Sequence, residues 1–474
     1  MITTGSGVKA WRARMGFSRK QAAQALGLAE ITIKSYELNK RQVSGSVGQL
    51  MTRLEREGKT VIPSVRNAPI RVVGGGTVFH VRNHLALACA VSGTTARTLS
   101  RMLHDMGESS ELILTRMADS SSPYETNADM QKLAEYIVAD KSAKIVFWNP
   151  ALCDYEGMVD DLPSGKKAKR LKTEDGEVVL RMKPANKVVD IFRKTRKDLF
   201  LVAFKTTTDA TPDEQYRAGL ALLKRASANL VLANDEVTGL NMVIVPEEAR
   251  YHETKDREEA LKGLVEMALL RSKNTFTRSK VMSNEGVKWN DDSIPDNLRD
   301  VVNHCIKRGA YKPFLGKTVG HFAVRGPNNT IITSKRKSNF NDLVSGKLDM
   351  VLIKPQHDNI VEAYGGKPSV GGMSQKIIFD EHPQATNIVH FHCPLKPSVK
   401  TVPVRPQRQN ECGSHQCGQN TSNGLKVVEG DIMAVMLDNH GPNIVYGRDT
   451  PSEKVIAFIE KHFDLDQKTG GMVA

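Results

Sequence analysis

Cysteine, aromatic side chains and long apolar runs are all scarce in this chain of 474 residues. Only six cysteines occur, and the four scattered ones, Cys89, Cys153, Cys305 and Cys393, predict buried thiols in a reducing compartment rather than a disulfide framework. The sequence has no run of about 18 apolar residues, which argues against a transmembrane helix. The first residues lack the apolar core of a signal peptide. We therefore expect a cytoplasmic protein with no membrane partner.

Composition and length indicate a globular chain of several domains. Hydrophobic residues make up 40% and charged residues 25%, and the length predicts about three domains. The net charge of +14 is unevenly placed, because residues 1–68 hold twelve basic and four acidic side chains. A dense positive segment attracts polyanions, and nucleic acid is the usual one. The alternative is a surface whose charge only keeps the protein soluble.

Proline- and glycine-containing stretches and changes in the apolar pattern divide the chain into five segments. Residues 1–58 have a helical pattern, and 59–69 form a proline-containing linker. In residues 70–249, apolar runs alternate with helical stretches, which predicts a parallel sheet with crossover helices. Residues 250–294 are charged and without strand patterns, so we expect a helical connector. Residues 295–474 predict an α/β domain that ends in a helix over 451–463.

The segment 18–38 predicts two helices joined by a tight turn. Ser18 is a good N-cap, Gly27 permits the turn, and Ala22, Ala23, Leu26, Ile31, Ile33 and Tyr36 supply apolar faces. This pattern resembles the helix-turn-helix of lambda-repressor-like proteins, in which the second helix enters the major groove of DNA. The resemblance implies that Glu30, Thr32, Lys34 and Ser35 contact base edges, that Lys40 and Arg41 contact phosphates, and that the protein is a homo-oligomer. A small helical bundle for protein contacts is the alternative.

The middle segment carries two features that suit a nucleotide. Gly74, Gly75 and Gly76 follow a predicted strand, where backbone amides can approach a phosphate closely. The basic run 164–172 offers cations for a triphosphate. Each feature has a plain alternative, a simple turn and a solvated loop.

The order of motifs in this segment, from GGGT through FWNPALCDYEG and KKAKRLK to LFLVAFKTTTD and LVLAND, resembles the phosphopantothenate–cysteine ligase family. The resemblance implies a Rossmann-like fold that binds a nucleoside triphosphate with Mg²⁺ and activates a carboxylate for attack by an amine. The spacing from Arg82 and Asn83 to Ser92 and Gly93 departs from the family pattern. By position, the nucleotide- and substrate-binding residues are Gly75, Gly76, Thr77, Asp154 with the adjacent Tyr155, Lys169, Arg170, Lys172, Phe204, Lys205 and Asn234.

Histidines mark the C-terminal segment. His390 and His392 flank Phe391 on a predicted strand, so alternation points both imidazoles to one face. Two such histidines and a third ligand make a zinc site with an open position, and His440 is the candidate for the third. A pair of histidines at this spacing is also commonly incidental.

The motifs GHFAVRGPNNTIITS, LDMVLIKP, HPQATNIVHFHCP and LDNHGPNIVYGR resemble the class II aldolase/adducin family. The resemblance implies Zn²⁺, or another divalent metal, on His390, His392 and His440, and a lyase reaction on a small phosphorylated or carboxylated metabolite. Thr333, Ser334 and Ser369 fall where the family holds a substrate phosphate. Two positions depart from the pattern, His321 and, at the place of the catalytic glutamate, Gly371. Asp380, Glu381 and Glu411 are the candidate replacements, and the sequence does not choose among them.

The stretch 409–420 places Cys412, His415 and Cys417 close together in the sequence. Such soft ligands suit a second metal site or an addition to the first. A glycine-rich loop with two free thiols is the equal alternative.

The resulting expectation is a multidomain α/β protein. It has a small all-α helix-turn-helix head, a Rossmann-like parallel-sheet domain and an α/β class II aldolase-like domain. The leading functional hypothesis is a metal- and nucleotide-dependent enzyme with a DNA-binding head. The alternative is a metabolite-sensing transcriptional regulator built from enzyme domains that no longer turn over.

Overall fold

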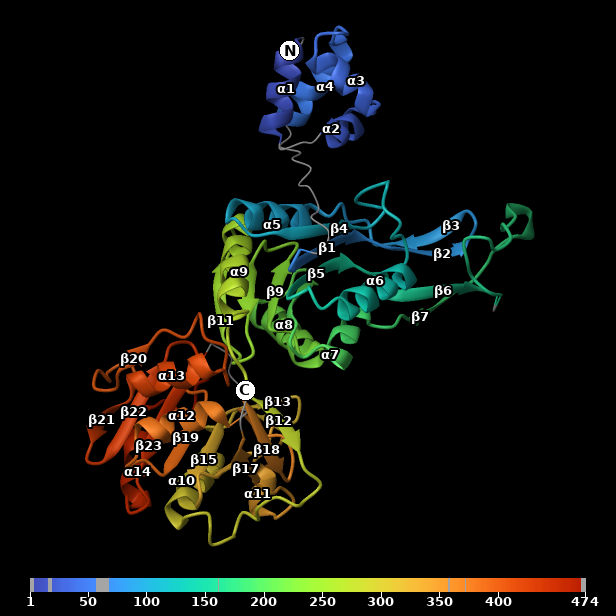
Figure 1. The fold of residues 1–474 in the computed structure, drawn as a ribbon. Helices are drawn as coiled ribbons and strands as arrows, with labels where there is room; N and C mark the ends of the chain where they lie inside the picture. Colours follow the sequence, from blue (N-terminus) through green and yellow to red (C-terminus); the bar gives the residue numbers. More distant parts are fainter. Residues whose placement is uncertain are drawn as a thin grey trace. The chain divides into compact units, whose positions relative to one another are not determined.

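The computed structural model describes residues 4–15, 19–56, 68–160, 162–356, 359–370 and 372–469, without the side chains of residues 14, 20, 21, 24 and 53–56 (Figure 1). The expected cap Ser18, residues 59–67 of the expected linker and Gly371 lie outside the described residues. The chain divides into two compact units, Met1–Val202 and Ala203–Ala474.

Four helices build the N-terminal part: α1 (Gly5–Arg14), α2 (Arg19–Leu26), α3 (Glu30–Glu37) and α4 (Gly45–Arg56). They pack around Trp11, which is fully buried and donates its indole N–H to the Met51 carbonyl at 3.0 Å. Gly27, with φ +65°, ends α2 in the left-handed conformation that favours glycine. Ile33 is buried as expected, but Ile31 is 67% exposed. Residues two apart on a helix point to nearly opposite sides, so both cannot face one core.

A parallel sheet forms the rest of the first unit. Its central strand β1 (Ile70–Gly76) is buried along its whole length and runs parallel to β4 (Ser110–Leu114) and β5 (Ile145–Ala151). The order is β4-β1-β5-β8, with β8 (Phe200–Thr207) crossing the boundary between the units. The helices are α5 (Thr94–Asp105), α6 (Asn127–Ala139) and α7 (Ile191–Thr195). The predicted parallel sheet is confirmed, because strands covered on both faces show as continuous apolar runs.

Two hairpins of this unit were not predicted from the sequence. They are β2 (Val78–Arg82) with β3 (Leu85–Ala88), and β6 (Tyr155–Val159) with β7 (Leu180–Pro184). Every residue of β7 is exposed, so the strand has no buried face to impose a pattern.

The second unit begins with β8 and continues in the order β8-β9-β10-β11. The strand β9 (Leu230–Asp235) pairs antiparallel with β10 (Asn241–Ile244), which pairs antiparallel with β11 (Arg250–Thr254). The helices are α8 (Pro212–Ala226) and α9 (Arg257–Arg271). The prediction of a strandless connector over 250–294 is wrong, since this segment contains β11, α9 and β12 (Arg278–Val281). The strands β11 and β12 are rich in charged residues and partly exposed, so they show no apolar pattern in the sequence.

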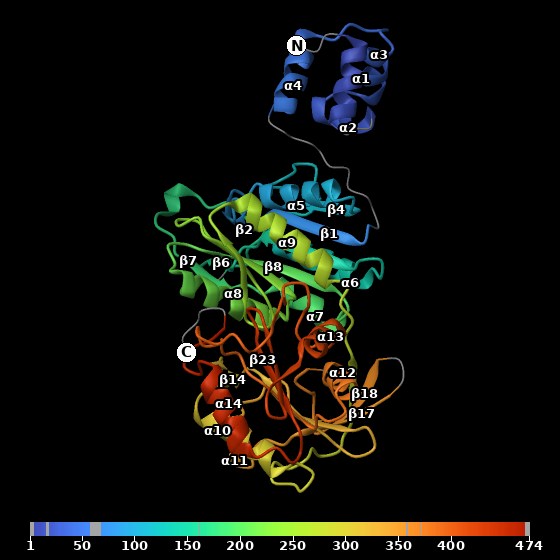
Figure 2. The same cartoon turned by 90° about the vertical axis from the view of Figure 1, so that its left-hand side faces the viewer.

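A ten-stranded sheet forms the remainder of the second unit (Figures 1 and 2). Its path is β12-β18-β17-β16-β15-β19-β23-β22-β20, with β21 paired to β22 outside this path. The further strands are β15 (His321–Arg325), β16 (Ile331–Thr333), β17 (Val351–Pro355), β18 (Ile360–Tyr364), β19 (Asn387–His390), β20 (Val404–Arg405), β21 (Lys426–Glu429), β22 (Ile432–Leu437) and β23 (Gly441–Tyr446). A separate hairpin joins β13 (Pro313–Phe314) to β14 (Lys317–Thr318).

Side chains of this sheet alternate between two hydrophobic cores. Phe322 and Val389 enter a core with α10 (Asp296–Lys307) and α14 (Ser452–His462). Ala323 and Ile388 enter the opposite core, which includes residues of α12 (Met373–Glu381). The views also show α10 beside α14, and α12 beside α13 (His415–Gly424); a short α11 (Asn341–Val344) lies near the sheet end. This alternation fixes which residues of β15, β19 and β23 face α12.

Among the described helices, none combines the length and the apolar character that crossing a bilayer requires.

Candidate functional site

Three histidines gather on the α12 face of the ten-stranded sheet. His390 ends β19, where its register partners are His321 of β15 and Asn443 of β23. Phe391 then continues the alternation into the opposite core, so His392 returns to the side of His390. His440 lies in the turn between β22 and β23. Antiparallel pairing across β23 thus brings His440 beside two residues far from it in sequence.

The three imidazoles lie close together and are buried. Ring centroids are separated by 5.1 Å for His390 and His392, 4.6 Å for His390 and His440, and 4.9 Å for His392 and His440. One ring nitrogen of each lies within 4.8 Å of one ring nitrogen of the other two. Within the described ranges, this is the one group of three or more His, Cys, Asp or Glu residues arranged to hold a metal ion.

The protonation of these rings suits metal ligation. Burial lowers the pKa of His390 to about 4, and it lowers the pKa values of His392 and His440 well below the usual range. All three are therefore neutral at pH 7, as a ligand must be. His390 Nδ1 lies 2.7 Å from the Pro442 carbonyl oxygen, an acceptor that requires a proton on Nδ1 and leaves the Nε2 lone pair free.

The opposite nitrogens have no protein partner. His390 Nε2, His392 Nδ1 and both nitrogens of His440 are buried without a hydrogen bond. Buried polar atoms rarely lack a hydrogen-bond partner, so these four nitrogens are expected to bind a ligand. A divalent metal of the zinc type fits this donor set, which leaves a coordination position open.

A fourth histidine and a glutamine, which was not predicted from the sequence, complete the site. The His321 ring lies 4.7 Å from that of His390, and His321 Nδ1 lies 3.1 Å from Gln375 Nε2. The fully buried Gln375 also donates to Thr333 Oγ1 at 3.1 Å. Both His321 and Gln375 line one pocket with His440, Asn443 and Cys412. A lone glutamine on a helix gives no sequence signal, because only the tertiary fold faces it toward the histidines.

The structure separates the three candidate carboxylates. Asp380 and Glu381 are exposed at the end of α12, where Asp380 pairs with Lys376 and Glu381 accepts from Ser422 Oγ at 2.5 Å. Glu411 is buried and accepts from Asn229 Nδ2 at 3.0 Å. None of the three belongs to the metal-binding group or lines the pocket with His440. Nothing in the described residues therefore supports a catalytic role for Asp380 or Glu381.

Cys412, His415 and Cys417, the candidates for a second metal site, are not among the described residues that are grouped to hold a metal ion. His415 and Cys417 lie two apart at the start of α13, which directs them to different sides of the helix. His415 Nε2 lies 3.0 Å from Thr277 Oγ1, and Cys417 accepts from Gln407 Nε2 at 3.3 Å. Cys412 lines the pocket, and burial raises the pKa of its thiol well above the usual range.

The candidate phosphate residues lie beside Gln375. Ser334 Oγ and Ser369 Oγ are 2.9 Å apart, and Thr333 donates to the Phe322 carbonyl oxygen at 3.1 Å. Thr333, Ser334 and Ser369 thus occupy adjoining positions in the structure.

In the first unit, the three glycines are the last residues of β1 itself, where they pair with β5, rather than a loop that follows the strand. Gly75 has φ +102°, and a side chain there would lie 2.3 Å from Thr115 Oγ1. Thr77 is fully buried, and its hydroxyl donates to Asn127 Oδ1 at 2.7 Å and accepts from the Cys153 N–H at 2.9 Å. Gly76 pairs in register with Ala151 of β5. Thr77 therefore anchors the end of β1 rather than presenting its hydroxyl to solvent.

The other expected nucleotide residues of this unit are exposed. Asp154 pairs with Lys187 at 2.5 Å, and Lys172 pairs with Glu174 at 2.9 Å. Tyr155, Lys169 and Arg170 are exposed as well. The buried Arg82 donates to the carbonyl oxygens of Val159 and Pro163, which makes it a support of the basic loop.

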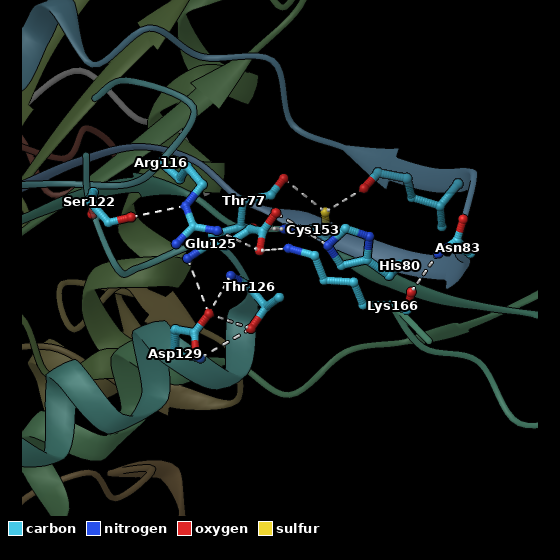
Figure 3. Close-up of polar contacts among 11 residues, drawn as sticks. Thr77, His80, Asn83, Arg116, Ser122, Glu125, Thr126, Asp129, Cys153 and Lys166 are labelled. Atoms are coloured by element: carbon cyan, nitrogen blue, oxygen red, sulfur yellow. Dashed lines mark hydrogen bonds and ion pairs between the residues drawn. The ribbon is translucent and has the colours of Figure 1, made fainter. Parts of the chain in front are cut away.

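A charge cluster at the start of α6 escaped the sequence analysis. Figure 3 shows the Glu125 carboxylate among Lys166, Arg116 and His80. Its distance is 2.6 Å to Lys166 Nζ and 3.2 Å to Arg116 Nη1. The hydrogen bond from Lys166 is the main cause that lowers the pKa of Glu125. Lys166, like Lys172 of the same basic run, is thus paired with a carboxylate of the protein itself.

In the second unit, Phe204 and Lys205 lie on β8 and Asn234 on the neighbouring β9. All three are half-buried, and Asn234 Oδ1 accepts from Thr206 Oγ1 at 3.4 Å.

The expected DNA-binding residues lie on or just after α3. Glu30, Lys34, Lys40 and Arg41 are exposed, and Thr32 and Ser35 are half-buried. The Ser35 hydroxyl donates to the Ile31 carbonyl oxygen at 2.8 Å.

No family model and no curated protein matches the chain. Parts of it are similar to solved structures. These include the DNA/pantothenate metabolism flavoprotein from Streptococcus pneumoniae, which is 21% identical over 42% of this chain and 97% of that one, with a TM-score of 0.36. The C-terminal domain of the coenzyme A biosynthesis bifunctional protein CoaBC is 13% identical over 42% and 94%, with a TM-score of 0.32. An L-fuculose 1-phosphate aldolase is 16% identical over 35% and 82%, with a TM-score of 0.26. The proposals below rest on the residues of this chain.

Proposed function

We propose that His390, His392 and His440 form a divalent-metal centre of the class II aldolase type, which acts on a small phosphorylated or carboxylated metabolite. The observation that carries this proposal is the set of buried, neutral and unpartnered ring nitrogens that converge within 4.8 Å. Zn²⁺ at such a centre supplies Lewis acidity toward a substrate carbonyl. The metal content of histidine variants tests the centre, as argued in the Discussion.

The residues around the centre would orient the substrate and its metal ligands. Pro442 fixes the His390 tautomer through its carbonyl oxygen, and Gln375 links His321 to Thr333. Asn443 lines the pocket between these groups. Such outer contacts keep ligand rings in one orientation and exclude competing geometries.

The parallel-sheet part of the first unit is proposed to bind a nucleoside triphosphate with Mg²⁺, as in phosphopantothenate–cysteine ligases. The support is the glycine-rich C-terminal end of the buried parallel strand β1, with Gly75 in a conformation that favours glycine. Lys169, Arg170 and Lys172 are proposed to contact the triphosphate. For the second unit by itself, Lys205 and Asn234 are proposed to contact a substrate.

Incubation with a nucleoside triphosphate, phosphopantothenate and cysteine is expected to release pyrophosphate. The chemical reason is that carboxylate activation as an acyl-nucleotide expels pyrophosphate before cysteine attacks. Pyrophosphate is measured by a coupled colorimetric assay, and omission of phosphopantothenate is the control. Tight nucleotide binding without turnover would contradict the ligase proposal and favour a sensor.

That second candidate, a metabolite-sensing transcriptional regulator, has its own supporting observation. Among the described residues, no carboxylate joins the histidine group, so proton transfer lacks an evident agent. A protein of this kind would bind its metabolite at the centre and report to the N-terminal helices.

These helices are proposed to bind DNA through α3. The exposed Lys34 of α3 suits a contact with a phosphate or a base edge. The exposed Ile31 suits an apolar contact with a thymine methyl group. Glu37, which is 2% exposed, is held between Arg12 and Arg19 and fixes α3 against the neighbouring helices.

Affinity for duplex DNA is expected to fall steeply with salt, because bound lysines and arginines release counterions. Lys34→Ala, Lys40→Ala and Arg41→Ala should each reduce the slope of log affinity against log salt by about one. Fluorescence anisotropy of the full chain with labelled duplex DNA measures the affinity at each salt concentration and hence the slope. Lys262→Ala, an exposed lysine outside these helices, is the control. A flat response to salt would remove the DNA proposal.

A further inference from the structure

The C-terminal segment 462–469 holds the part of the chain that carries His392. The strand β19 ends at His390, so His392 lies beyond the last residue that pairs in register with β23. Backbone hydrogen bonds join the two segments, from the Lys396 N–H to the His462 carbonyl oxygen at 2.9 Å, from the Asp464 N–H to the Pro394 carbonyl oxygen at 3.0 Å, and from the Thr469 N–H to the His392 carbonyl oxygen at 3.0 Å. The last of these bonds attaches a proposed metal ligand directly to the C-terminal segment.

Lys468 fixes the end of this segment. Its side chain is 1% exposed and forms a hydrogen-bonded ion pair with the equally buried Glu248. Glu248 lies in the turn between β10 and β11, and it also pairs with Lys224 of α8 at 2.8 Å. Burial raises the pKa of Glu248, but the charges of Lys224 and Lys468 outweigh it, so this pKa lies below its usual range. The carboxylate is therefore ionised, and the contact with Lys468 is a charged one.

The surroundings of Glu248 make it a fixed point for Lys468. Its φ of +65° lies in the left-handed region, which residues with a side chain rarely adopt. The fully buried Tyr216 donates its hydroxyl to the Glu248 carbonyl oxygen at 2.5 Å. Such a conformation persists where the surrounding contacts over-determine it. Tyr216 and Lys224 thus hold Glu248 in place independently of Lys468.

The ion pair lies close to the proposed metal centre. Lys468 directly precedes Thr469, whose N–H binds the His392 carbonyl oxygen. Burial, and after it the two other histidines, lowers the pKa of His392, and the charges of Lys468 and Lys224 add to this effect. A buried ion pair loses the hydration of both charges and is weak evidence for stability. The pair at this place is therefore better explained by the position that it fixes.

We propose that Lys468 and Glu248, here called the C-terminal anchor, are positioning residues that hold segment 462–469 against His392 and thereby set where its ring lies. The anchor rests on the proposed function, because it needs a metal ion on the three histidines. A ligand that is free to move must be ordered when the metal binds, and this ordering weakens the affinity. His390 is held by its register pairs in the sheet and should keep its place without the anchor.

Lys468→Met and Thr469→Pro in the full chain test the anchor, with Zn²⁺ affinity measured by competition with a chelator. Lys468→Met removes the charge, and Thr469→Pro removes the N–H that binds the His392 carbonyl oxygen. Each should weaken Zn²⁺ binding about 10- to 100-fold. Thr469→Ala keeps this N–H, and Lys461→Met removes an exposed lysine that pairs with Glu429, so both controls should bind Zn²⁺ as the parent does.

A double-mutant cycle shows whether the anchor acts through His392. In a His392→Ala background, Lys468→Met should cause no further loss of Zn²⁺ affinity, whereas two independent effects would add. The visible spectrum of Co²⁺ bound to Lys468→Met should shift from that of the parent toward that of His392→Ala. A role in general stability would produce neither result. If Lys468→Met does not fold, the comparison of Thr469→Pro with Thr469→Ala decides the question.

Two results would overturn the C-terminal anchor and leave the proposed metal centre intact. The first is a parent that binds Zn²⁺ while Lys468→Met and Thr469→Pro bind it equally well. The second is a loss through Lys468→Met that is as large in the His392→Ala background as in the parent. A parent that binds no divalent metal would instead remove the proposed centre, and the anchor with it.

Discussion

Purified protein is expected to carry about one Zn²⁺ per chain, and His390→Ala or His440→Ala should lose it. Loss of residues that only orient a metal ligand costs 10–100-fold in affinity, so removal of a ligand itself should cost more than about 100-fold. The reason is that a zinc site of this type has three protein ligands, and two imidazoles alone hold the metal weakly. Metal is measured by elemental analysis after dialysis against a weak chelator, and Co²⁺ spectra report the ligand geometry.

Two further histidines serve as controls for this result. His304 pairs with Glu460 at 2.8 Å, away from the centre, so His304→Ala should keep full metal content. His415→Ala should also keep one metal, because His415 is turned toward Thr277. If the variants of His390 and His440 retained all their metal, the centre would be misassigned.

Replacing Arg271 by methionine is expected to destabilise the second unit strongly. Arg271 and Glu247 are both fully buried and pair at 2.5 Å, and Arg271 Nε also donates to the Arg408 carbonyl oxygen at 2.8 Å. Removal of the guanidinium leaves a carboxylate uncompensated in a low-dielectric interior. Breaking such a buried pair costs about 3–5 kcal/mol of the free energy of unfolding. Chemical denaturation followed by intrinsic fluorescence measures this loss.

The double variant Arg271→Met with Glu247→Leu distinguishes the stranded charge from lost packing. It should recover most of the stability, since apolar residues of similar size often replace a buried pair without loss. Arg308→Met, which removes an exposed partner of Glu460, should change little. A double variant as unstable as Arg271→Met alone would show that packing, and not charge, dominates.

Residues with a strong local pattern were predictable from the sequence. The run IRVVGGG is buried along its whole length as β1, and its parallel neighbours β4 and β5 were visible as apolar runs of the same kind. The alternation of side chains around Phe391 was enough to place His390 and His392 on one side of the sheet. The mixed α/β architecture with a parallel sheet therefore follows from the sequence.

Elements that lack a local pattern were missed or misjudged. The strand β12 is short and charged, and it exists because it pairs in parallel with β18, about eighty residues later. Asp380 and Glu381 were attractive as carboxylates near the histidines in sequence, yet the helix α12 ends with both side chains exposed. Gln375, earlier on that helix, is the residue that faces the site.

Sequence alone determined the buried apolar strands of the parallel sheet and the common side of the sheet that His390 and His392 occupy, because each depends on a pattern among near neighbours. Tertiary structure decided that His440 lies beside His390 and His392, and that Gln375 links His321 to Thr333. These groups meet only when strands distant in sequence pair to bury their apolar faces, and the register of that pairing is set by the whole sheet.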